Sequence, residues 1–168
     1  MNASPLLVIA LMQSLFVANA ALPELKTNPP MILNETPSMA KGVYVRLGEV
    51  ADIKRGDIIA MPMNSTAQNY LVEKLVYPKD TMLIKRVAGL AGDFVCRHDS
   101  VVTINKRTLV AARSDRQGNL LPAWNGCRTL STSEVFLLGD HPASFDSRYF
   151  GPVSQGELAG IYRAAVTW

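Results

Sequence analysis

Short apolar runs recur along most of this chain, with turn-forming residues between them. Successive side chains of a strand point to opposite faces, so short alternating runs bounded by Gly, Pro, Asn or Asp are typical of β-strands. We expect strands at residues 43–47, 57–61, 82–88, 93–97, 101–104, 108–112, 135–138 and 161–168. Many short strands at close spacing predict a mainly β domain, built as a barrel or as packed sheets.

Helical signals are few. The pattern predicts one short helix at 69–76 and a weaker one at 154–158. Asn105-Lys106 and residues 115–118 have the composition of hairpin turns, and the polar segment 114–132 reads as an excursion over the surface.

The N-terminal region differs in composition from the rest. Residues 5–21 are uncharged and mostly apolar, which fits a signal peptide cleaved after Ala18-Asn19-Ala20, a short membrane anchor, or a buried helix of the domain. Residues 23–37 contain four prolines and predict an extended, stiff spacer. We therefore expect a signal peptide or anchor at 1–22, a spacer at 23–37 and a single domain at 38–168. The first two interpretations place that domain in the periplasm.

Lys85 lies where a lysine is least expected. In the strand 82–88 it shares a face with Leu83 and Val87. If that face is buried, the ammonium group loses hydration, and its pKa falls from about 10.4. A neutral lysine can act as a general base. The alternative is an ordinary solvated lysine that protects an exposed sheet edge.

Composition excludes some classes of function. The formal net charge is only +3, and the basic residues are scattered without interleaved aromatics, which argues against nucleic-acid binding. His98 and His141 lack metal-ligand spacing, so we expect no metal and no cofactor. Cys96 and Cys127 could form a disulfide in an oxidising compartment or remain two free thiols, and the sequence leaves both open.

Four segments together resemble the signal peptidase I family of serine peptidases. The third and fourth are the most specific, and the order of all four matches the family. They are residues 36–39 (TPSM), 54–59 (KRGDII), 85–93 (KRVAGLAGD) and 138–153 (LGDHPASFDSRYFGPV). The resemblance extends from Thr36 to the C-terminus and implies the β-fold of that family, with antiparallel strands and one or two short helices.

The resemblance implies that Ser38 is the nucleophile and Lys85 its general base. The chemistry is reasonable without the family, because a serine hydroxyl attacks a carbonyl poorly until a neighbouring base takes its proton. The backbone N–H of Ser38 would stabilise the oxyanion, and the resemblance assigns a second donor to the hydroxyl of Thr36.

The fourth segment implies residues that support this pair. Ser144 matches a family serine that hydrogen-bonds the lysine, and Asp146 is expected to orient the Ser–Lys pair. Asp146 can pair with Arg148, and Asp140 can pair with Arg86 or Arg148, which would fix the strand that carries the lysine.

Several features are closer to the TraF-type peptidases of conjugative plasmids than to general leader peptidases. They are the Gly-x-Tyr after the serine, His141 where leader peptidases have asparagine, and a compact chain. That branch implies a precursor protein, most readily a pilin, processed at the outer face of the cytoplasmic membrane, with membrane lipid as a second partner. Some members of the branch cyclise their product, and the sequence does not distinguish hydrolysis from cyclisation.

Four alternatives remain at this stage. The chain could be a general signal peptidase I. Ser38 or Ser144 could instead act with His141 and Asp146 as a Ser–His–Asp hydrolase. The domain could be a non-catalytic part of a periplasmic assembly machine. A self-cleaving Ser–Lys repressor is disfavoured, because no DNA-binding helix pair precedes the catalytic region.

Overall fold

A computed structural model describes residues 28–168 of the chain, and residues 31–168 form one compact unit. The predicted signal peptide or anchor at 1–22 lies outside the described residues. Among residues 28–168, no helix combines the length and the apolar composition that a membrane span requires. Two antiparallel sheets build the unit, which confirms the predicted mainly β fold.

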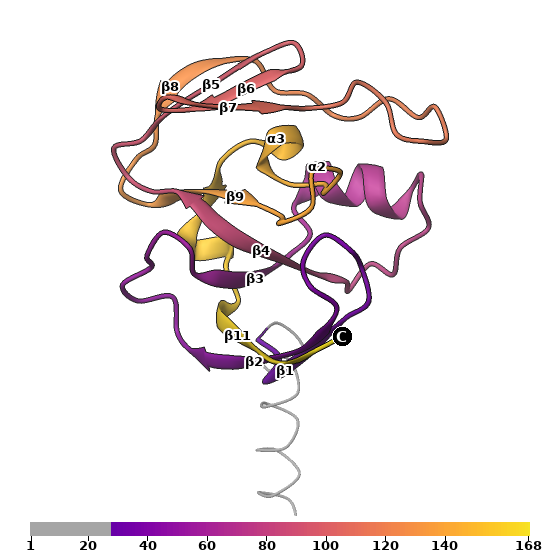
Figure 1. Ribbon diagram of the computed structural model, residues 1–168, viewed down its shortest axis with the longest axis vertical. Helices are drawn as coiled ribbons and strands as arrows, with labels where there is room; N and C mark the ends of the chain where they lie inside the picture. The colour runs from indigo at the N-terminus through magenta and orange to yellow at the C-terminus, as the bar shows by residue number, and fades with distance from the viewer. Residues whose placement is uncertain (1–27) are drawn as a thin grey trace, which may run out of the picture. The chain divides into compact units, whose positions relative to one another are not determined.

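The larger sheet has seven strands in the order β1-β2-β11-β3-β4-β9-β10. Their bounds are β1 Met31–Asn34, β2 Gly42–Gly48, β3 Ile58–Pro62, β4 Met82–Gly89, β9 Glu134–Leu138, β10 Val153–Ser154 and β11 Gly160–Thr167. The C-terminal strand β11 lies between β2 and β3, so the end of the chain joins the two halves of the sheet (Figure 1).

The smaller sheet has four strands in the order β7-β6-β5-β8. They are β5 Phe94–His98, β6 Val101–Ile104, β7 Arg107–Val110 and β8 Gly126–Thr129. Cys96 and Cys127 are directly opposite each other in the β5–β8 pair and form a disulfide, which settles the alternative that the sequence left open.

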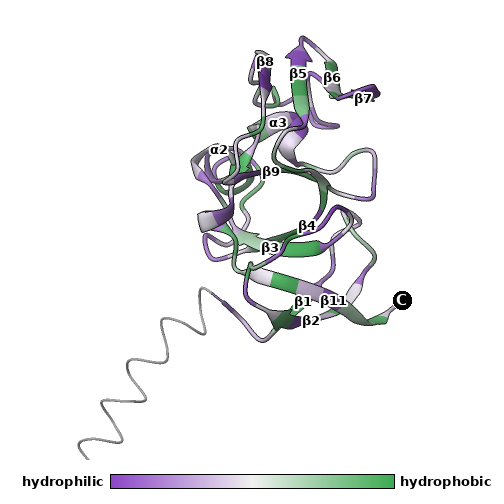
Figure 2. Cartoon of the chain, turned by 90° about the vertical axis from the view of Figure 1, so that its left-hand side faces the viewer, coloured by the Kyte–Doolittle hydropathy of each residue, from purple (hydrophilic) through white to green (hydrophobic). Residues whose placement is uncertain are grey.

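Short helical segments lie between and beside the sheets. They are α2 Ser65–Ala67, the π-helical η1 Gln68–Val72, α3 Ser147–Phe150 and the 3-10 segment η2 Gln155–Glu157. α3 lies between the smaller sheet and β9 in both orientations of the domain (Figures 1 and 2). α3 is itself part of the segment 138–153 that the sequence singled out.

All eight predicted strands are present, with ends shifted by at most two residues. Three strands were not predicted. β1 lies in the expected spacer, β8 lies in the expected surface excursion, and β10 has only two residues. β1 and β8 carry no clear alternation of their own, and each forms because a longer neighbour supplies the hydrogen-bonding edge.

The helix predicted at 69–76 instead begins at Ser65. Asn64 caps it by accepting a hydrogen bond from the Ala67 N–H at 2.9 Å, a signal that the apolar periodicity alone does not contain. The second prediction, 154–158, appears as the three-residue segment η2, and α3 was not predicted.

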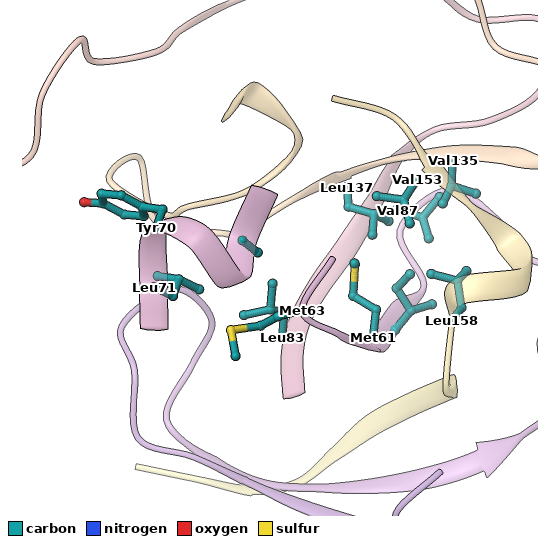
Figure 3. Close-up of a cluster of buried hydrophobic side chains, with 12 residues drawn as sticks. Met61, Met63, Tyr70, Leu71, Leu83, Val87, Val135, Leu137, Val153 and Leu158 are labelled. Carbon is teal, nitrogen blue, oxygen red and sulfur yellow. The ribbon is translucent and has the colours of Figure 1, made fainter. Parts of the chain in front are cut away.

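The main core lies on one side of the central strands. Its side chains come from β3, β4, β9 and the α2–η1 segment, and include Met61, Leu83, Val87 and Leu137 (Figure 3). The hydropathy colouring shows apolar character concentrated on β3 and β9 (Figure 2). Strand β4 therefore crosses the interior of the domain with Lys85 on it.

Candidate active site

Strand β4 carries Lys85 into the protein interior. β4 pairs with β3 from Met82 to Arg86 and with β9 from Arg86 to Gly89, and Lys85 lies opposite Ile59 of β3. Leu83 and Val87, which share its face, are buried, and Lys85 itself is only 3% exposed. The alternative of a solvated edge lysine is therefore wrong.

Ser38 lies directly at the end of the Lys85 side chain. The ammonium nitrogen Nζ donates to Ser38 Oγ at 2.7 Å and to the Ile84 carbonyl at 3.0 Å. Ser144 Oγ lies 2.9 Å from Ser38 Oγ. Ser144 therefore bonds the nucleophile and not the lysine that the resemblance had implied as its partner, because among residues 28–168 Nζ donates to Ser38 and Ile84. The serine hydroxyl is thus held between a buried amine and a second hydroxyl, although 47 and 106 residues separate Ser38 from them in sequence.

The surroundings of Lys85 favour its neutral form. Burial lowers the pKa of Lys85 from 10.5 to about 8; the Asp146 carboxylate opposes this shift and the Arg148 guanidinium adds to it. A lysine with such a pKa is partly neutral at physiological pH, so it can accept a proton from a hydroxyl within hydrogen-bonding distance.

Asn34 holds the loop that carries Ser38. This buried side chain, at the end of β1, donates through Nδ2 to the carbonyls of Thr36, Met39 and Ala40 at 3.0, 3.2 and 3.0 Å. The Thr36 hydroxyl donates to Asn34 Oδ1 at 2.8 Å, so in this structure it supports the loop. Nothing in the sequence pattern pointed to Asn34.

Gly139 allows Ser144 and the Ser38 loop to come together. A Cβ atom at position 139 would lie 2.1 Å from Ser144 Oγ and 2.8 Å from the Ser38 carbonyl oxygen. The His141 N–H donates to that same carbonyl at 3.2 Å. The Leu-Gly-Asp sequence after β9 therefore has a steric reason, because any side chain at 139 would separate the two serines.

Asp146 and Arg148 form a buried ion pair below Ser144. Arg148 donates to both Asp146 carboxylate oxygens at 2.8 Å and to the Ser144 carbonyl at 2.9 Å, and Asp146 Oδ2 also accepts the Gly139 N–H at 2.9 Å. Asp146 is fully buried, and Arg148 is 5% exposed. The pair thus ties both ends of the 139–146 loop together.

Arg86 and Asp140 form a second, more exposed pair. Two hydrogen bonds of 2.8 and 2.7 Å join the guanidinium to the carboxylate, and the third nitrogen of Arg86 donates to the Gly56 carbonyl at 2.9 Å. The predicted partners thus meet, but on the face of β4 opposite to Lys85. The pair connects the Arg-Gly-Asp turn with the 139–146 loop.

A profile of the family described as "Signal peptidase, peptidase S26" matches residues 3–168. The chain belongs to this peptidase family. The plasmid transfer protein TraF of Escherichia coli is 36% identical over 91 residues, which cover 51% of this chain and about half (51%) of that relative's length. The conjugal transfer protein TraF of Agrobacterium tumefaciens is 31% identical over 147 residues, which cover 81% of this chain and 82% of that protein. A crystal structure of a signal peptidase I from Enterococcus faecalis is 27% identical and covers 66% of this chain and 96% of that one, with a TM-score of 0.38.

In this S26 peptidase, His141 does not form a Ser–His–Asp arrangement. Its ring atom Nδ1 accepts a hydrogen bond from the Ala143 N–H at 3.1 Å, and the imidazole is exposed. Both carboxylate oxygens of Asp146 accept hydrogen bonds from Arg148, and Oδ2 also accepts one from Gly139. The geometry therefore favours Lys85 over His141 as the partner of Ser38.

Phe145 also fixes the position of Ser144, a role that its place in the segment 138–153 did not predict. Its ring stacks on Tyr70 of η1 at 4.8 Å between centroids and on Tyr149 of α3 at 5.3 Å. The Tyr70 hydroxyl donates to Asp115 at 2.8 Å. The residue between Ser144 and Asp146 is therefore held from both sides by aromatic rings.

Proposed function

We propose that this chain is a serine endopeptidase with a Ser38–Lys85 dyad that cleaves a precursor protein. The observation that carries the proposal is the 2.7 Å contact between Ser38 Oγ and the Nζ of a lysine that is 3% exposed. Burial favours the neutral form of Lys85, which can act as the base. The hydrogen bond between Nζ and Ser38 Oγ provides the path for the proton. Membership in the signal peptidase family supports a precursor protein as substrate.

The reaction would begin with neutral Lys85. Ser38 Oγ attacks the scissile carbonyl carbon while its proton moves to Lys85 Nζ, and the carbonyl oxygen becomes an oxyanion. Collapse of this intermediate breaks the C–N bond, and the ammonium of Lys85 gives its proton to the leaving amine. An acyl-enzyme on Ser38 remains, and Lys85 is neutral again.

The oxyanion would be stabilised by N–H and O–H donors near Ser38. None of the residues 28–168 accepts a hydrogen bond from the Ser38 N–H, so this donor remains available to a substrate. Thr36 could supply a second donor if its hydroxyl turned from Asn34 toward the substrate. We assign Thr36 this role as part of the proposal.

The supporting residues would act through Ser144 and the loop that carries it. Ser144 accepts or donates a hydrogen bond with Ser38 Oγ and so limits the rotation of the nucleophile. Asp146 and Arg148 hold the backbone on both sides of Ser144, while Arg86 and Asp140 join that loop to β4. We therefore treat Asp146 as a positioning residue that also affects the Lys85 pKa through space.

We infer that the substrate is a pilin precursor of a conjugative transfer system. The two TraF relatives carry plasmid transfer and conjugal transfer in their names, and the match to the second covers most of both chains. The enzyme would act in the periplasm, at the outer face of the cytoplasmic membrane, where its apolar N-terminal segment contacts lipid as an anchor or has been removed as a signal peptide. Either water or the N-terminal amine of the acylated fragment itself could resolve the acyl-enzyme, and the second route would give a cyclic product.

A general signal peptidase I is the second candidate, and the family description favours it equally. The two candidates differ in substrate range. A conjugative enzyme would leave ordinary secretory precursors whole, whereas a general enzyme would cleave them.

Mass spectrometry of a candidate pilin precursor from the same transfer region, co-expressed with the enzyme, tests this function. We expect the wild type to shorten the precursor and Ser38→Ala and Lys85→Met to leave it whole, with all three proteins folded by circular dichroism. A product one water lighter than the linear fragment would establish cyclisation. Cleavage by folded Ser38→Ala would contradict the proposed mechanism.

A further inference from the structure

Two side chains outside the site donate hydrogen bonds to consecutive carbonyls of α3, the short helix that Asp146 caps. Arg97, on β5, donates to the Arg148 carbonyl, and the Trp124 indole N–H donates to the Ser147 carbonyl at 2.9 Å. Arg97 of the smaller sheet and Trp124, which precedes its strand β8, therefore hold the helix that carries Arg148 and that Asp146 caps.

Arg97 is an unusual residue for this position. It is only 2% exposed, and no acidic side chain among residues 28–168 forms an ion pair with it. Its other acceptors are the carbonyls of Asp99 and Pro122, at 3.0 and 3.4 Å, and its guanidinium carbon lies 5.8 Å from the centroid of the Tyr149 ring. Burying a cation without a carboxylate is costly, so packing stability alone does not explain an arginine here.

Trp124 contacts α3 from the segment that connects β7 and β8. Besides its hydrogen bond to Ser147, the indole lies against Gly151 at the end of α3 and makes an edge contact with Phe136, with ring centroids 6.1 Å apart. A phenylalanine at 124 could keep most of this packing and would lose only the N–H donor.

The disulfide lies close in sequence to both Arg97 and Trp124. Cys96 immediately precedes Arg97, and Cys127 lies three residues after Trp124. The bond crosslinks β5 to β8 and so limits how far the segments that carry the two donors can separate.

We propose that Arg97 and Trp124, whose neighbouring residues Cys96 and Cys127 form the disulfide, are positioning residues for the Ser38–Lys85 reaction. They hold α3, α3 holds Asp146 and Arg148, and these hold Ser144 against Ser38. The inference rests on the proposed function, because only a reaction at Ser38 gives the position of Ser144 a consequence.

The experiment compares Trp124→Phe and Arg97→Met with wild type and with Arg128→Met. Arg128 is the matched control because it lies on β8 of the same sheet and pairs with Glu134 at the surface, away from α3. Trp124→Phe is the decisive variant, because it changes no charge and cannot alter Lys85 by simple electrostatics. Each protein is assayed for kcat and KM on the cleaved precursor, for thermal stability, and for the pKa of Lys85 by carbon-13 NMR of labelled lysine, assigned with Lys85→Met.

We expect Trp124→Phe and Arg97→Met to lower kcat by about ten- to a hundredfold, the cost of a small misplacement of a catalytic group, with little change in KM. The Lys85 pKa should rise in both, because a looser Ser144 loop admits water to the ammonium group. Arg128→Met should keep the kcat and the Lys85 pKa of wild type.

Two results would overturn the inference: a folded Trp124→Phe with the kcat and Lys85 pKa of wild type, or an equal loss of kcat in Arg128→Met. The proposed function fails in a different way, namely when folded Ser38→Ala processes the precursor as wild type does. The NMR measurement needs no substrate, so it tests the effect on Lys85 even then.

Discussion

At the scale of single residues, Lys85 combines two properties that oppose each other. A buried lysine next to Ser38 is a useful base because it gives up its proton easily, but the same burial makes its protonated form unfavourable in the folded state. The folded pKa of about 8 lies below the ordinary value of 10.5. The site therefore has a cost in stability that depends on pH.

This cost predicts a stabilising substitution. Below about pH 8, Lys85 is protonated in both folded and unfolded chains, and the full cost of the buried charge is present. As pH rises from about 8 toward 10.5, the folded state loses its proton first, and the cost disappears. Lys85→Met should therefore raise the free energy of unfolding at about pH 7 and raise it less at about pH 9.5. Urea denaturation at both pH values measures this. A Lys85→Met variant that is less stable than wild type at the lower pH would contradict the assigned burial.

Gly139 provides the sharpest steric test. A Cβ at this position would lie 2.1 Å from Ser144 Oγ, so Gly139→Ala should push the two serines apart and abolish most of the activity, and it should cost about 1–3 kcal/mol of stability. Gly48→Ala is the control, because its Cβ would have no heavy atom within 4 Å. Thermal unfolding and precursor cleavage measure the two effects. Equal behaviour of the two variants would refute the close approach at Gly139.

At the scale of elements, the 139–150 segment depends on one buried ion pair more than on the exposed one. Arg148 and Asp146 are nearly inaccessible, whereas the side chains of Arg86 and Asp140 are 40% and 45% exposed. Breaking a buried pair leaves an unpaired charge, while an exposed pair is largely replaced by water.

The two arginines should therefore differ strongly on substitution. Arg148→Met should lower the free energy of unfolding by about 3–5 kcal/mol, and Arg86→Met should change it by less than about 1 kcal/mol. Chemical denaturation of both variants measures this difference. Similar losses in the two variants would mean that the Asp146–Arg148 pair is not as buried as described.

An element could be predicted from the sequence when its own residues carry the apolar pattern, and could not when it forms through contacts with other elements. β4 and β9 carry short apolar runs of their own, so both strands could be predicted, whereas the burial of the Lys85 face could be stated only as a condition. β1 and β8 form on the edges of neighbouring strands, and α3 is a four-residue helix capped by Asp146, so no local periodicity marks them. Ser38, Lys85 and Ser144 were found because they lie in the matched segments. Asn34 lies outside those segments and holds its own loop through carbonyls two to six residues away. Arg97 also lies outside them, and the contacts of Arg97 with Arg148 and of Phe145 with Tyr70 join residues far apart in sequence, which no local pattern reveals.

At the scale of the whole molecule, the two sheets have different roles in the candidate active site. The seven-stranded sheet carries Lys85 on β4 and reaches the Ser38 loop through β1 and β2, while the four-stranded sheet braces α3 through β5 and the segment before β8. The disulfide lies in the second sheet, and the two cysteines are 31 residues apart in sequence.

Removal of this disulfide should weaken the whole domain. Replacing both cysteines with serine frees a long loop in the unfolded chain, and we expect a loss of about 2–4 kcal/mol in the free energy of unfolding. Denaturation of the double variant and of wild type treated with a reductant should agree. No difference between oxidised and reduced wild type would show that the bond does not brace the fold.

Catalysis by this site requires above all that Lys85 takes the proton of Ser38. The direct measurement is the rate of a single acylation of Ser38 by a synthetic peptide ester, followed by intact-protein mass spectrometry across the pH range. We expect the wild-type rate to rise with pH around a midpoint of about 8, as Lys85 becomes neutral, and then to level off. Folded Ser38→Ala should gain no mass, and folded Lys85→Met should acylate at least about a hundredfold more slowly than wild type at every pH. Acylation of Lys85→Met at the wild-type rate, with the same pH profile, would contradict the account.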